Sequence, residues 1–301
     1  RSTGPRLRSD HAFRGRIRIA AQCRDILARC SGGGVGALQR QTMGTLSMRT
    51  LLHSEGLSVG FGGSVLISDV NIALHAGEVG ALIGLNGTGK STLLRTLAGL
   101  HEPLDGTITV NDRPLAAMSS LERARALSVV LTGKPQAGLL DVRTLVSLGR
   151  QPWTGHLGRL TPKDHDRIDE AMERTGVTSF SERSLQSLSD GEGQKVLIAR
   201  ALAQDAPVML LDEPTAFLDL VNRVSVMRLL RDIARTSDRA VLLSTHDLTS
   251  ALQLCDRILL VHGGTLWTGT PGEAISSGVL DRAFATQGMR FDPSTASLIA
   301  E

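Results

Sequence analysis

The feature that most constrains this chain is the glycine-rich segment at residues 84–91, Gly-Leu-Asn-Gly-Thr-Gly-Lys-Ser, which fits the pattern GxxxxGK[ST] without a mismatch. The apolar run Val79–Ile83 precedes it, and a segment with helical spacing, Ser91–Ala98, follows it. A strand, a glycine loop and a helix in this order predict a phosphate-binding loop, because the glycines let successive backbone N–H groups surround the phosphates. We therefore expect Lys90 to reach the β- and γ-phosphates of a nucleotide and the Ser91 hydroxyl to bind Mg²⁺.

A second motif, Pro207-Val-Met-Leu-Leu-Asp-Glu, narrows the choice among kinases, GTPases and motors, which share such loops. Its apolar residues predict a buried strand that ends at Asp212, and a carboxylate in this place lies beside the Mg²⁺. Glu213 follows directly and can polarise an attacking water as a general base. An acidic turn after a core strand is the alternative, but it is weak beside a phosphate-binding loop. The two carboxylates indicate hydrolysis in preference to phosphoryl transfer onto another substrate.

The spacing of apolar residues predicts two groups of strands with a helical insert between them. Short apolar runs separated by glycine turns begin near Met48, and later apolar runs are separated by helix-length segments, as in a mostly parallel sheet covered on both faces. The expected strands are Leu57–Phe61, Val65–Ile67, Val70–Leu74, Val79–Ile83, Thr107–Val110, Leu127–Leu131, Val208–Leu211, Val241–Ser244 and Ile258–Val261. Within the insert, helices are expected at Val142–Gly149 and Pro162–Arg174, the latter capped by Thr161.

The third motif is Leu188-Ser-Asp-Gly-Glu-Gly-Gln, which opens a helical run. It resembles the LSGGQ signature of ATP-binding-cassette (ABC) ATPases, and Asp219 and His246 also stand where the order of that family's motifs requires. The resemblance covers about residues 48–290 and implies an α/β fold. The implied fold is a P-loop NTPase (RecA-like) core with an N-terminal antiparallel β subdomain and a helical, signature-bearing subdomain at about residues 132–190. A C-terminal tail at residues 291–301 would follow.

The resemblance also implies the roles of individual residues. His246 matches the family's switch histidine at the γ-phosphate and would be catalytic together with Glu213, although a lone histidine at a strand end is usually structural. Phe61 matches the position whose ring stacks on adenine, and an ordinary core phenylalanine is the alternative. The implied ligands are ATP and Mg²⁺, with Ser91 and Asp212 as metal ligands. The implied nucleotide-binding residues are Phe61, Gly84, Asn86, Gly87, Thr88, Gly89, Lys90, Ser91, Thr92, Thr132, Ser189 and Gly191.

Members of this family pair head to tail, so that each ATP lies between the phosphate-binding loop of one subunit and the signature of the other. The signature begins a helix, and Ser189 and the N–H groups near Gly191 can therefore meet the γ-phosphate across the interface. A homodimer that closes on ATP and opens after hydrolysis is the expected working unit.

The segments Val142–Trp153 and Asp212–Asp219 look like those of the ATPases of vitamin B12, haem and ferric-siderophore importers. That branch implies two transmembrane permease subunits, an extracytoplasmic binding protein as an indirect partner, and a peripheral place on the cytoplasmic face of the cell membrane. Ferric siderophore or a related iron chelate is the expected cargo, although no residue of such a subunit contacts the cargo.

Two positions depart from the family pattern. Thr132 stands where the family has a glutamine that touches the metal-bound water and senses the membrane partner, and its hydroxyl has a shorter reach. We expect Thr132 to keep this role with altered coupling between the membrane subunits and hydrolysis. Asp190 and Glu192 place two carboxylates in the signature, where they could repel a triphosphate. Because Asp is a good N-cap and Glu suits a first helical turn, we expect Asp190 to cap the helix.

Composition separates a basic leader from the rest of the chain. Residues 1–47 hold nine Arg and two acidic residues, a net charge of +7, so the remainder is at −4 although the whole chain is at +3. We interpret the leader as a disordered extension, or as translated sequence before a start at Met48 or Met43, and a transit peptide is the alternative.

Other functional classes fit the sequence less well. No run of eighteen apolar residues that could span a bilayer occurs, and the three cysteines form no CxxC pair and suit a reducing compartment. Aromatic residues make up 3% of the chain and include no Tyr, so few rings could stack on nucleic acid and no such partner is expected. A soluble ABC ATPase acting on nucleic acid or ribosomes remains the main alternative. A regulatory cassette that only binds ATP is a weaker one, because Lys90, Asp212, Glu213 and His246 are all present.

Overall fold

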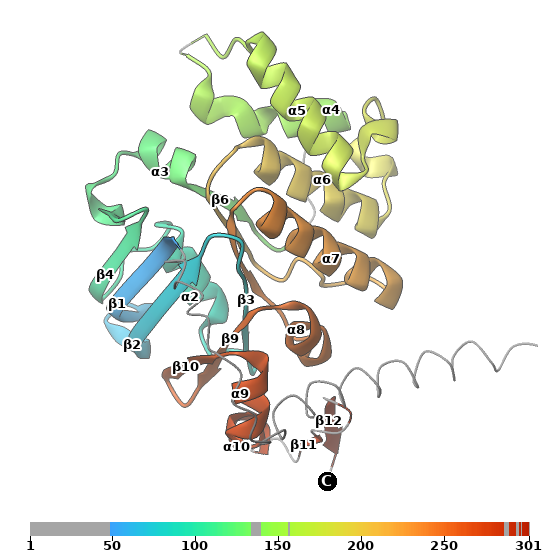
Figure 1. Cartoon of the computed structure of the whole chain (residues 1–301). Helices are drawn as coiled ribbons and strands as arrows, with labels where there is room; N and C mark the ends of the chain where they lie inside the picture. The colour runs from blue at the N-terminus through green and yellow to red at the C-terminus, as the bar shows by residue number, and fades with distance from the viewer. Residues whose placement is uncertain are drawn as a thin grey trace, which may run out of the picture. The chain divides into compact units, whose positions relative to one another are not determined.

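A computed structural model describes residues 49–133, 140–155, 157–285, 289–292, 295 and 297–300 of the chain (Figure 1). Residues 48–271 form one compact unit, and residues 272–301 belong to a second unit. The predicted extension at residues 1–47 lies outside the described residues. Within the described ranges, no helix combines the length and the apolar character that crossing a membrane requires.

An antiparallel sheet forms the first part of the larger unit, with strand order β2-β1-β4-β5. Its strands are β1 (Thr50–Phe61), β2 (Ser64–His75), β4 (Asp105–Val110) and β5 (Arg113–Pro114). The sequence predicted two strands where the structure has β2 alone. Asp69, read as a turn residue, adopts a positive φ of 52° within the strand, and the register of β2 against β1 shifts nearby. A β-bulge of this kind bends a strand without ending it.

A six-stranded sheet forms the centre of the unit, with order β10-β9-β3-β8-β7-β6. Its strands are β3 (Val79–Gly84), β6 (Leu127–Val130), β7 (Val208–Leu211), β8 (Ala240–Ser244), β9 (Arg257–His262) and β10 (Thr265–Gly269). Only β10 runs antiparallel to its neighbour among these strands, so the prediction of a mostly parallel sheet is confirmed. Because β3, β8 and β7 are parallel neighbours, their carboxyl ends lie side by side at one edge of the sheet.

Helices fill the space between the two sheets and cover the central sheet from outside (Figure 1). Helix α2 (Lys90–Leu97) contacts β1 on one side and β3 and β8 on the other, and its leucines join a continuous apolar core with strands of both sheets. Helix α7 (Leu220–Thr236) contacts β3 and β8 as well. The remaining elements near the sheets are η1 (Leu115–Ala117), α3 (Ser120–Ala126) and α8 (Leu248–Leu254).

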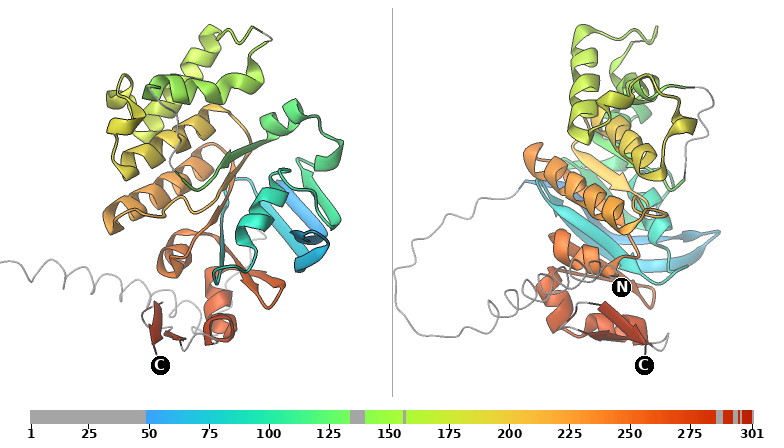
Figure 2. Two further views of the ribbon diagram at one scale, coloured as in Figure 1. Left: turned by 180° about the vertical axis from the view of Figure 1, so that it is seen from behind. Right: turned by 90° about the vertical axis from the view of Figure 1, so that its right-hand side faces the viewer.

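A helical layer extends from one end of the central sheet (Figure 2). It consists of α4 (Val142–Ser147), η2 (Leu148–Trp153), α5 (Pro162–Thr175), η3 (Thr178–Phe180), η4 (Leu185–Ser187) and α6 (Asp190–Ala203). Thr161 caps α5 as predicted, since its hydroxyl accepts the N–H of Asp164 and the Asp164 carboxylate accepts the N–H of Thr161. The start of α5 is therefore set by two residues three positions apart.

The smaller unit is described by itself. Helix α9 (Pro271–Ser276) begins at the division between the units, and α10 (Val279–Phe284) follows it. Strands β11 (Met289–Asp292) and β12 (Ser297–Ala300) pair antiparallel, and the Phe291 N–H donates to the Asp281 carboxylate at 2.9 Å. This bond ties the hairpin to α10.

Candidate nucleotide site

The phosphate-binding loop joins β3 to α2 and has a backbone that requires glycine. Gly84, Gly87 and Gly89 have φ values of 149°, 77° and 98°, a region that other residues rarely adopt. A Cβ at Gly84 would lie 2.6 Å from the Val261 carbonyl oxygen, whereas a Cβ at Gly87 would meet nothing within 4 Å. The loop is therefore packed tightly at its base and open at its tip, where phosphates could approach the backbone.

Lys90 lies across this loop. Its ammonium group donates to the carbonyl oxygens of Gly84 at 2.9 Å and Leu85 at 2.8 Å, and the side chain is buried. Burial lowers the pKa of Lys90, and the nearby carboxylates of Glu213 and Asp212 oppose this shift without cancelling it. The charge of the lysine is thus held at the centre of the loop, facing the two carboxylates that follow β7.

Ser91 and Asp212 meet as the sequence predicted for a metal site, although they are far apart in the chain. The Ser91 hydroxyl donates to the Asp212 carboxylate at 3.1 Å, and the buried Ser244 hydroxyl donates to the same carboxylate oxygen at 2.8 Å. A hydroxyl and a carboxylate are hard oxygen ligands, and Mg²⁺ is usually held by one or two carboxylates together with the phosphates of its substrate. The residues present therefore fit Mg²⁺, with Ser91 and Asp212 as its protein ligands.

Glu213 follows Asp212 and turns its carboxylate toward His246. The His246 Nε2 atom lies 2.6 Å from a carboxylate oxygen of Glu213, and both side chains are partly exposed. Glu213 has a positive φ of 50°, which is uncommon for a residue other than glycine and often accompanies function. The two residues expected to be catalytic thus form a hydrogen-bonded pair.

Thr132 lies just past β6 and beside Asp212. Its hydroxyl donates to the main-chain carbonyl oxygen of Asp212 at 2.9 Å, not to the carboxylate. Gln136, which could substitute for the family's glutamine only if the loop were shifted, is among residues 134–139, which lie outside the described residues. The structure therefore places Thr132 beside the candidate metal site, bonded to the backbone of Asp212.

Phe61 ends β1 and is half exposed, so it is not an ordinary core residue. Its ring meets the His101 ring edge to face, with centroids 5.2 Å apart and an angle of 80° between the planes. An exposed ring supported from one side can receive a planar base on its free face. No pattern in the sequence indicated that His101 would support the Phe61 ring.

The remaining loop residues complete the predicted set. The Thr88 hydroxyl donates to the Leu85 carbonyl at 2.8 Å, Thr92 is buried in the first turn of α2, and Asn86 is exposed at the loop. The Thr88 hydroxyl therefore bonds within the loop, and Asn86 is exposed on it.

The signature residues are organised around the start of α6. Ser189 is the N-cap, because its hydroxyl accepts the Glu192 N–H and the Glu192 carboxylate accepts the Ser189 N–H at 2.8 Å. The expectation that Asp190 caps the helix is wrong, since Asp190 is the first helical residue and the extended Ser189 before it already provides the cap. At Gly191 an added Cβ would lie 2.9 Å from the Asn222 side chain, so α6 and α7 approach closely only with glycine there.

The comparison with known proteins agrees with this geometry. A profile of the ABC transporter family matches residues 67–216. The iron(3+)-hydroxamate import ATP-binding protein FhuC of Bacillus subtilis is 34% identical over 234 residues, which cover 77% of this chain and 87% of that protein. The chain belongs to the ABC transporter family.

Two further similarities refine the family assignment. The cobalamin import ATP-binding protein BtuD of Halobacterium salinarum is 39% identical over 249 residues, which cover 82% of this ABC subunit but only 62% of the length of that relative. The solved structure of a transporter described as metal-chelate type, in an inward-facing conformation, superposes with a TM-score of 0.70 at 28% identity and covers 78% of this chain and 89% of that chain. This ABC subunit therefore shares the fold of a chain of that transporter.

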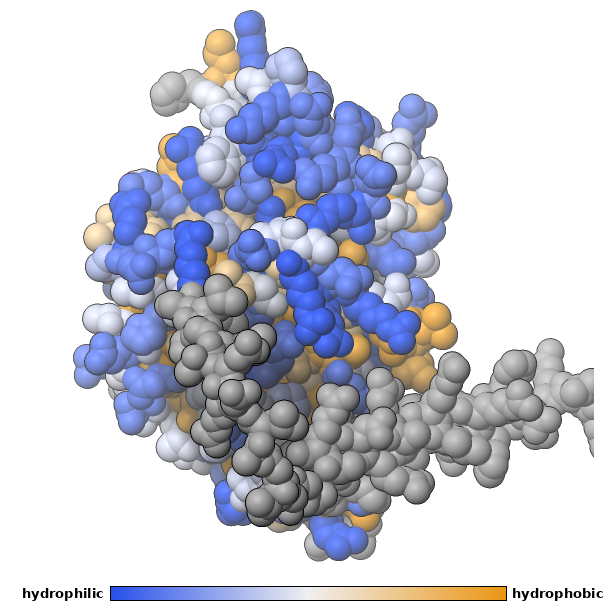
Figure 3. Space-filling model, in the orientation of Figure 1, coloured by the Kyte–Doolittle hydropathy of each residue, from blue (hydrophilic) through white to orange (hydrophobic). Residues whose placement is uncertain are grey.

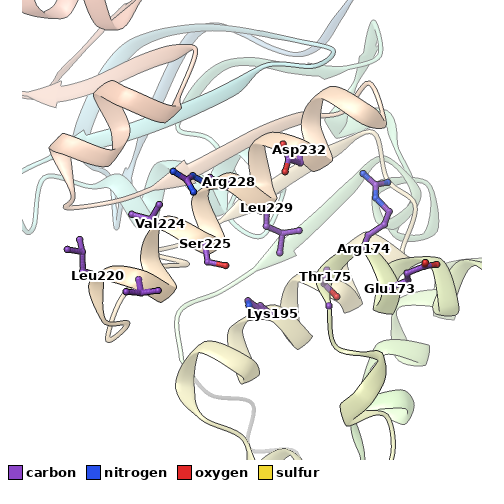
Figure 4. A pocket seen from close by; sticks show the side chains of 12 residues that line it. Glu173, Arg174, Thr175, Lys195, Leu220, Val224, Ser225, Arg228, Leu229 and Asp232 are labelled. Carbon is purple, nitrogen blue, oxygen red and sulfur yellow. The ribbon is translucent and has the colours of Figure 1, made fainter. Parts of the chain in front are cut away.

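A groove of about 660 Å³ in this ABC subunit lies between α5, α6 and α7, where the Lys195 side chain faces the α7 side chains (Figure 4). Leu220 and Val221 at its rim are strongly exposed, and apolar surface gathers near this end of α7 (Figure 3). None of the predicted nucleotide-site residues lines the groove. A smaller hollow is lined by Glu213 and His246 together with Arg223 and Asp247, so the hydrogen-bonded Glu213–His246 pair borders a separate space.

Ser244 is the main residue of this ABC site that the sequence analysis missed. It ends β8, accepts the Glu213 N–H at 2.8 Å and donates to the Asp212 carboxylate. A serine at the end of an apolar strand, two residues before His246, was the signal that could have revealed it. Because Ser244 is fully buried, its hydroxyl is fixed by the sheet.

Proposed function

We propose that this ABC subunit hydrolyses ATP to ADP and phosphate, with Glu213 as the general base. The observation that carries the proposal is the hydrogen-bonded series from Ser91 through Asp212 and Ser244 to Glu213 and His246. It joins a phosphate-binding loop, a metal-ligand pair and a carboxylate within reach of an attacking water, which is the set that hydrolysis needs.

Each residue has a distinct part in the proposed reaction. The loop N–H groups and Lys90 bind and orient the phosphates, and Mg²⁺ on Ser91 and Asp212 would neutralise charge that develops on them. Glu213 accepts the proton of the attacking water at its carboxylate. His246, 2.6 Å from that carboxylate, keeps Glu213 oriented, and we assign it the contact with the γ-phosphate.

The proposed working unit is a homodimer. Ser189 and Gly191 lie at the start of α6, where Ser189 bonds Glu192 of α6 and Gly191 packs against Asn222 of α7. A partner subunit in head-to-tail arrangement would bring its own signature to this loop and complete the site. Two permease subunits and, through them, an extracytoplasmic binding protein would couple hydrolysis to transport at the cytoplasmic face of the membrane.

The proposed cargo is a ferric siderophore or a related iron chelate. This rests on the printed names of relatives, since FhuC is an iron(3+)-hydroxamate import protein and BtuD a cobalamin import protein. Uptake of a radiolabelled ferric hydroxamate and of labelled cobalamin would be compared in cells with and without the gene. Loss of iron uptake alone supports the proposal, and loss of cobalamin uptake alone contradicts it.

The hydrolytic proposal is tested with the purified subunit. Glu213→Gln keeps the size of the side chain but removes the base, and we expect the ATPase rate to fall by at least about 100-fold. Glu102→Gln, an exposed carboxylate in the loop after α2, is the matched control and should keep the parental rate. If the parent protein did not hydrolyse ATP in the presence of Mg²⁺, the alternative of a regulatory cassette that only binds ATP would be favoured.

A further inference from the structure

The peptide bond between Asp212 and Glu213 is held from both sides by side-chain hydroxyls. Its carbonyl oxygen accepts a bond from the Thr132 hydroxyl at 2.9 Å, and its N–H donates to the Ser244 hydroxyl at 2.8 Å. One peptide therefore links the metal ligand to the general base, and both of its polar groups are engaged.

The sheet explains why these two hydroxyls are in place. Strand β7 lies between β6 and β8, and the Asp212 N–H still donates to the Val130 carbonyl of β6 at 2.8 Å. For the peptide between Asp212 and Glu213, β6 and β8 no longer offer main-chain partners. Thr132, just past β6, and Ser244, at the end of β8, supply a donor and an acceptor in their place.

Glu213 needs this support because its backbone is unfavourable. A φ of 50° costs a non-glycine residue free energy, so the conformation persists only where neighbouring groups fix it. This conformation also turns the Glu213 carboxylate to within 2.6 Å of His246. Freeing either side of the peptide would let the carboxylate move.

We infer that Thr132 is a positioning residue for the general base, acting through the Asp212–Glu213 peptide. The inference rests on the proposed hydrolytic role of Glu213. A threonine hydroxyl has a single proton, and here that proton is donated to the Asp212 carbonyl. Thr132 takes the place of the glutamine in the family pattern. It differs from that glutamine because a role in positioning Glu213 requires no contact with the metal-bound water.

The test replaces the hydroxyl by a methyl group of the same shape. Thr132→Val should lower kcat for ATP about tenfold, because a small misplacement of a catalytic group is costly. KM for ATP and the Kd of a non-hydrolysable ATP analogue should stay within about twofold, since the phosphate-binding loop is untouched. Thr132→Ser restores the hydroxyl and should recover most of kcat.

Thr175→Val is the matched control, because the Thr175 hydroxyl also donates to a main-chain carbonyl, that of Ala171 at 2.8 Å, but in α5. It should leave kcat unchanged. The Mg²⁺ concentration for half-maximal rate separates the alternatives, since a contact with metal-bound water predicts a several-fold rise in Thr132→Val and a positioning role predicts no change.

The outcomes separate this inference from the proposed function. If Thr132→Val keeps the parental kcat, or loses activity only through a higher Mg²⁺ requirement, or is not rescued by serine, the inference is overturned while hydrolysis by Glu213 stands. If the parent protein shows no ATP turnover, the proposed hydrolysis and the positioning role of Thr132 are both overturned, because Glu213 would then not act as a base.

Discussion

The nucleotide site and the helical layer of this ABC subunit keep polar groups in place by different means. In the nucleotide site, Asp212 and Glu213 follow one strand and are bonded by hydroxyls from its two neighbours. In the helical layer, a buried ion pair joins Arg150 of η2 to Asp164 of α5 at 2.9 Å. The first arrangement orients the groups proposed to react, and the second holds helices together. Substitutions should therefore affect the rate of hydrolysis in one region and stability in the other.

Arg150 joins three segments of the helical layer. Besides Asp164, it donates to the Ala203 carbonyl at the end of α6 at 2.8 Å, and both charged side chains are at most 5% exposed. Burial raises the pKa of Asp164, but hydrogen bonds from Thr161 and Arg150 outweigh it and leave the pKa lowered. The pair thus has the partners that a buried charge requires.

The largest predicted effect on stability follows from removing Arg150. Arg150→Met leaves the Asp164 carboxylate buried without its cation, and we expect the free energy of unfolding to fall by about 3 kcal/mol. Urea denaturation measures this loss. Arg143→Met removes an exposed ion pair with Asp169, whose side chains are 44% and 59% exposed, and should cost less than about 1 kcal/mol. Equal losses would show that burial does not distinguish the two pairs.

The pH dependence of this effect has a definite sign. Because the pKa of Asp164 is lowered in the folded state, its ion pair stabilises fully above the ordinary Asp pKa of about 3.9. That contribution is lost as the pH falls through the lowered value. The difference between the parent and Arg150→Met should therefore persist at neutral pH and shrink in acid.

A smaller effect, on binding and not on stability, is predicted at Phe61. Phe61→Ala removes the exposed ring, and the Kd of a non-hydrolysable ATP analogue should rise about tenfold, since stacking on a base is worth roughly 1–3 kcal/mol. Phe61→Trp keeps a ring and should bind nearly as well as the parent. Inorganic triphosphate has no base, so its affinity should not change in either variant, and a parallel loss would point to a disturbed phosphate-binding loop. Isothermal titration calorimetry measures both ligands on the parent protein and on the two variants.

The smallest predicted effect compares two capping boxes with the same geometry. Ser189 at α6 and Ser119 at α3 each cap a helix with a glutamate three residues later. Either serine changed to alanine should lower the free energy of unfolding by about 1 kcal/mol. Only Ser189→Ala should also weaken ATP-dependent dimerisation, measured by sedimentation in the Glu213→Gln background. If Ser119→Ala weakened the dimer as much, the signature would have no special part at the interface.

Sequence patterns predicted the structure correctly where a local element is formed by residues close together in the chain. The phosphate-binding loop, the strands around it and the Thr161 cap follow from residues a few positions apart. Asp190 and the single strand β2 were read incorrectly for a related reason. A neighbouring serine was the better cap, and a bulge at Asp69 looks like a turn in a sequence.

The sequence by itself determined which chemical groups this protein has: a loop for phosphates, two successive carboxylates, a histidine and a signature at the start of a helix. Only the tertiary structure decided which of them meet. Thr132 lies 80 positions from Asp212 in the chain and Ser244 lies 32 positions from it, yet both bond to it. The strand order β8-β7-β6 places both hydroxyls beside one peptide. The physical reason is that hydrogen bonds between parallel strands depend on strand order, which spacing along a chain does not reveal.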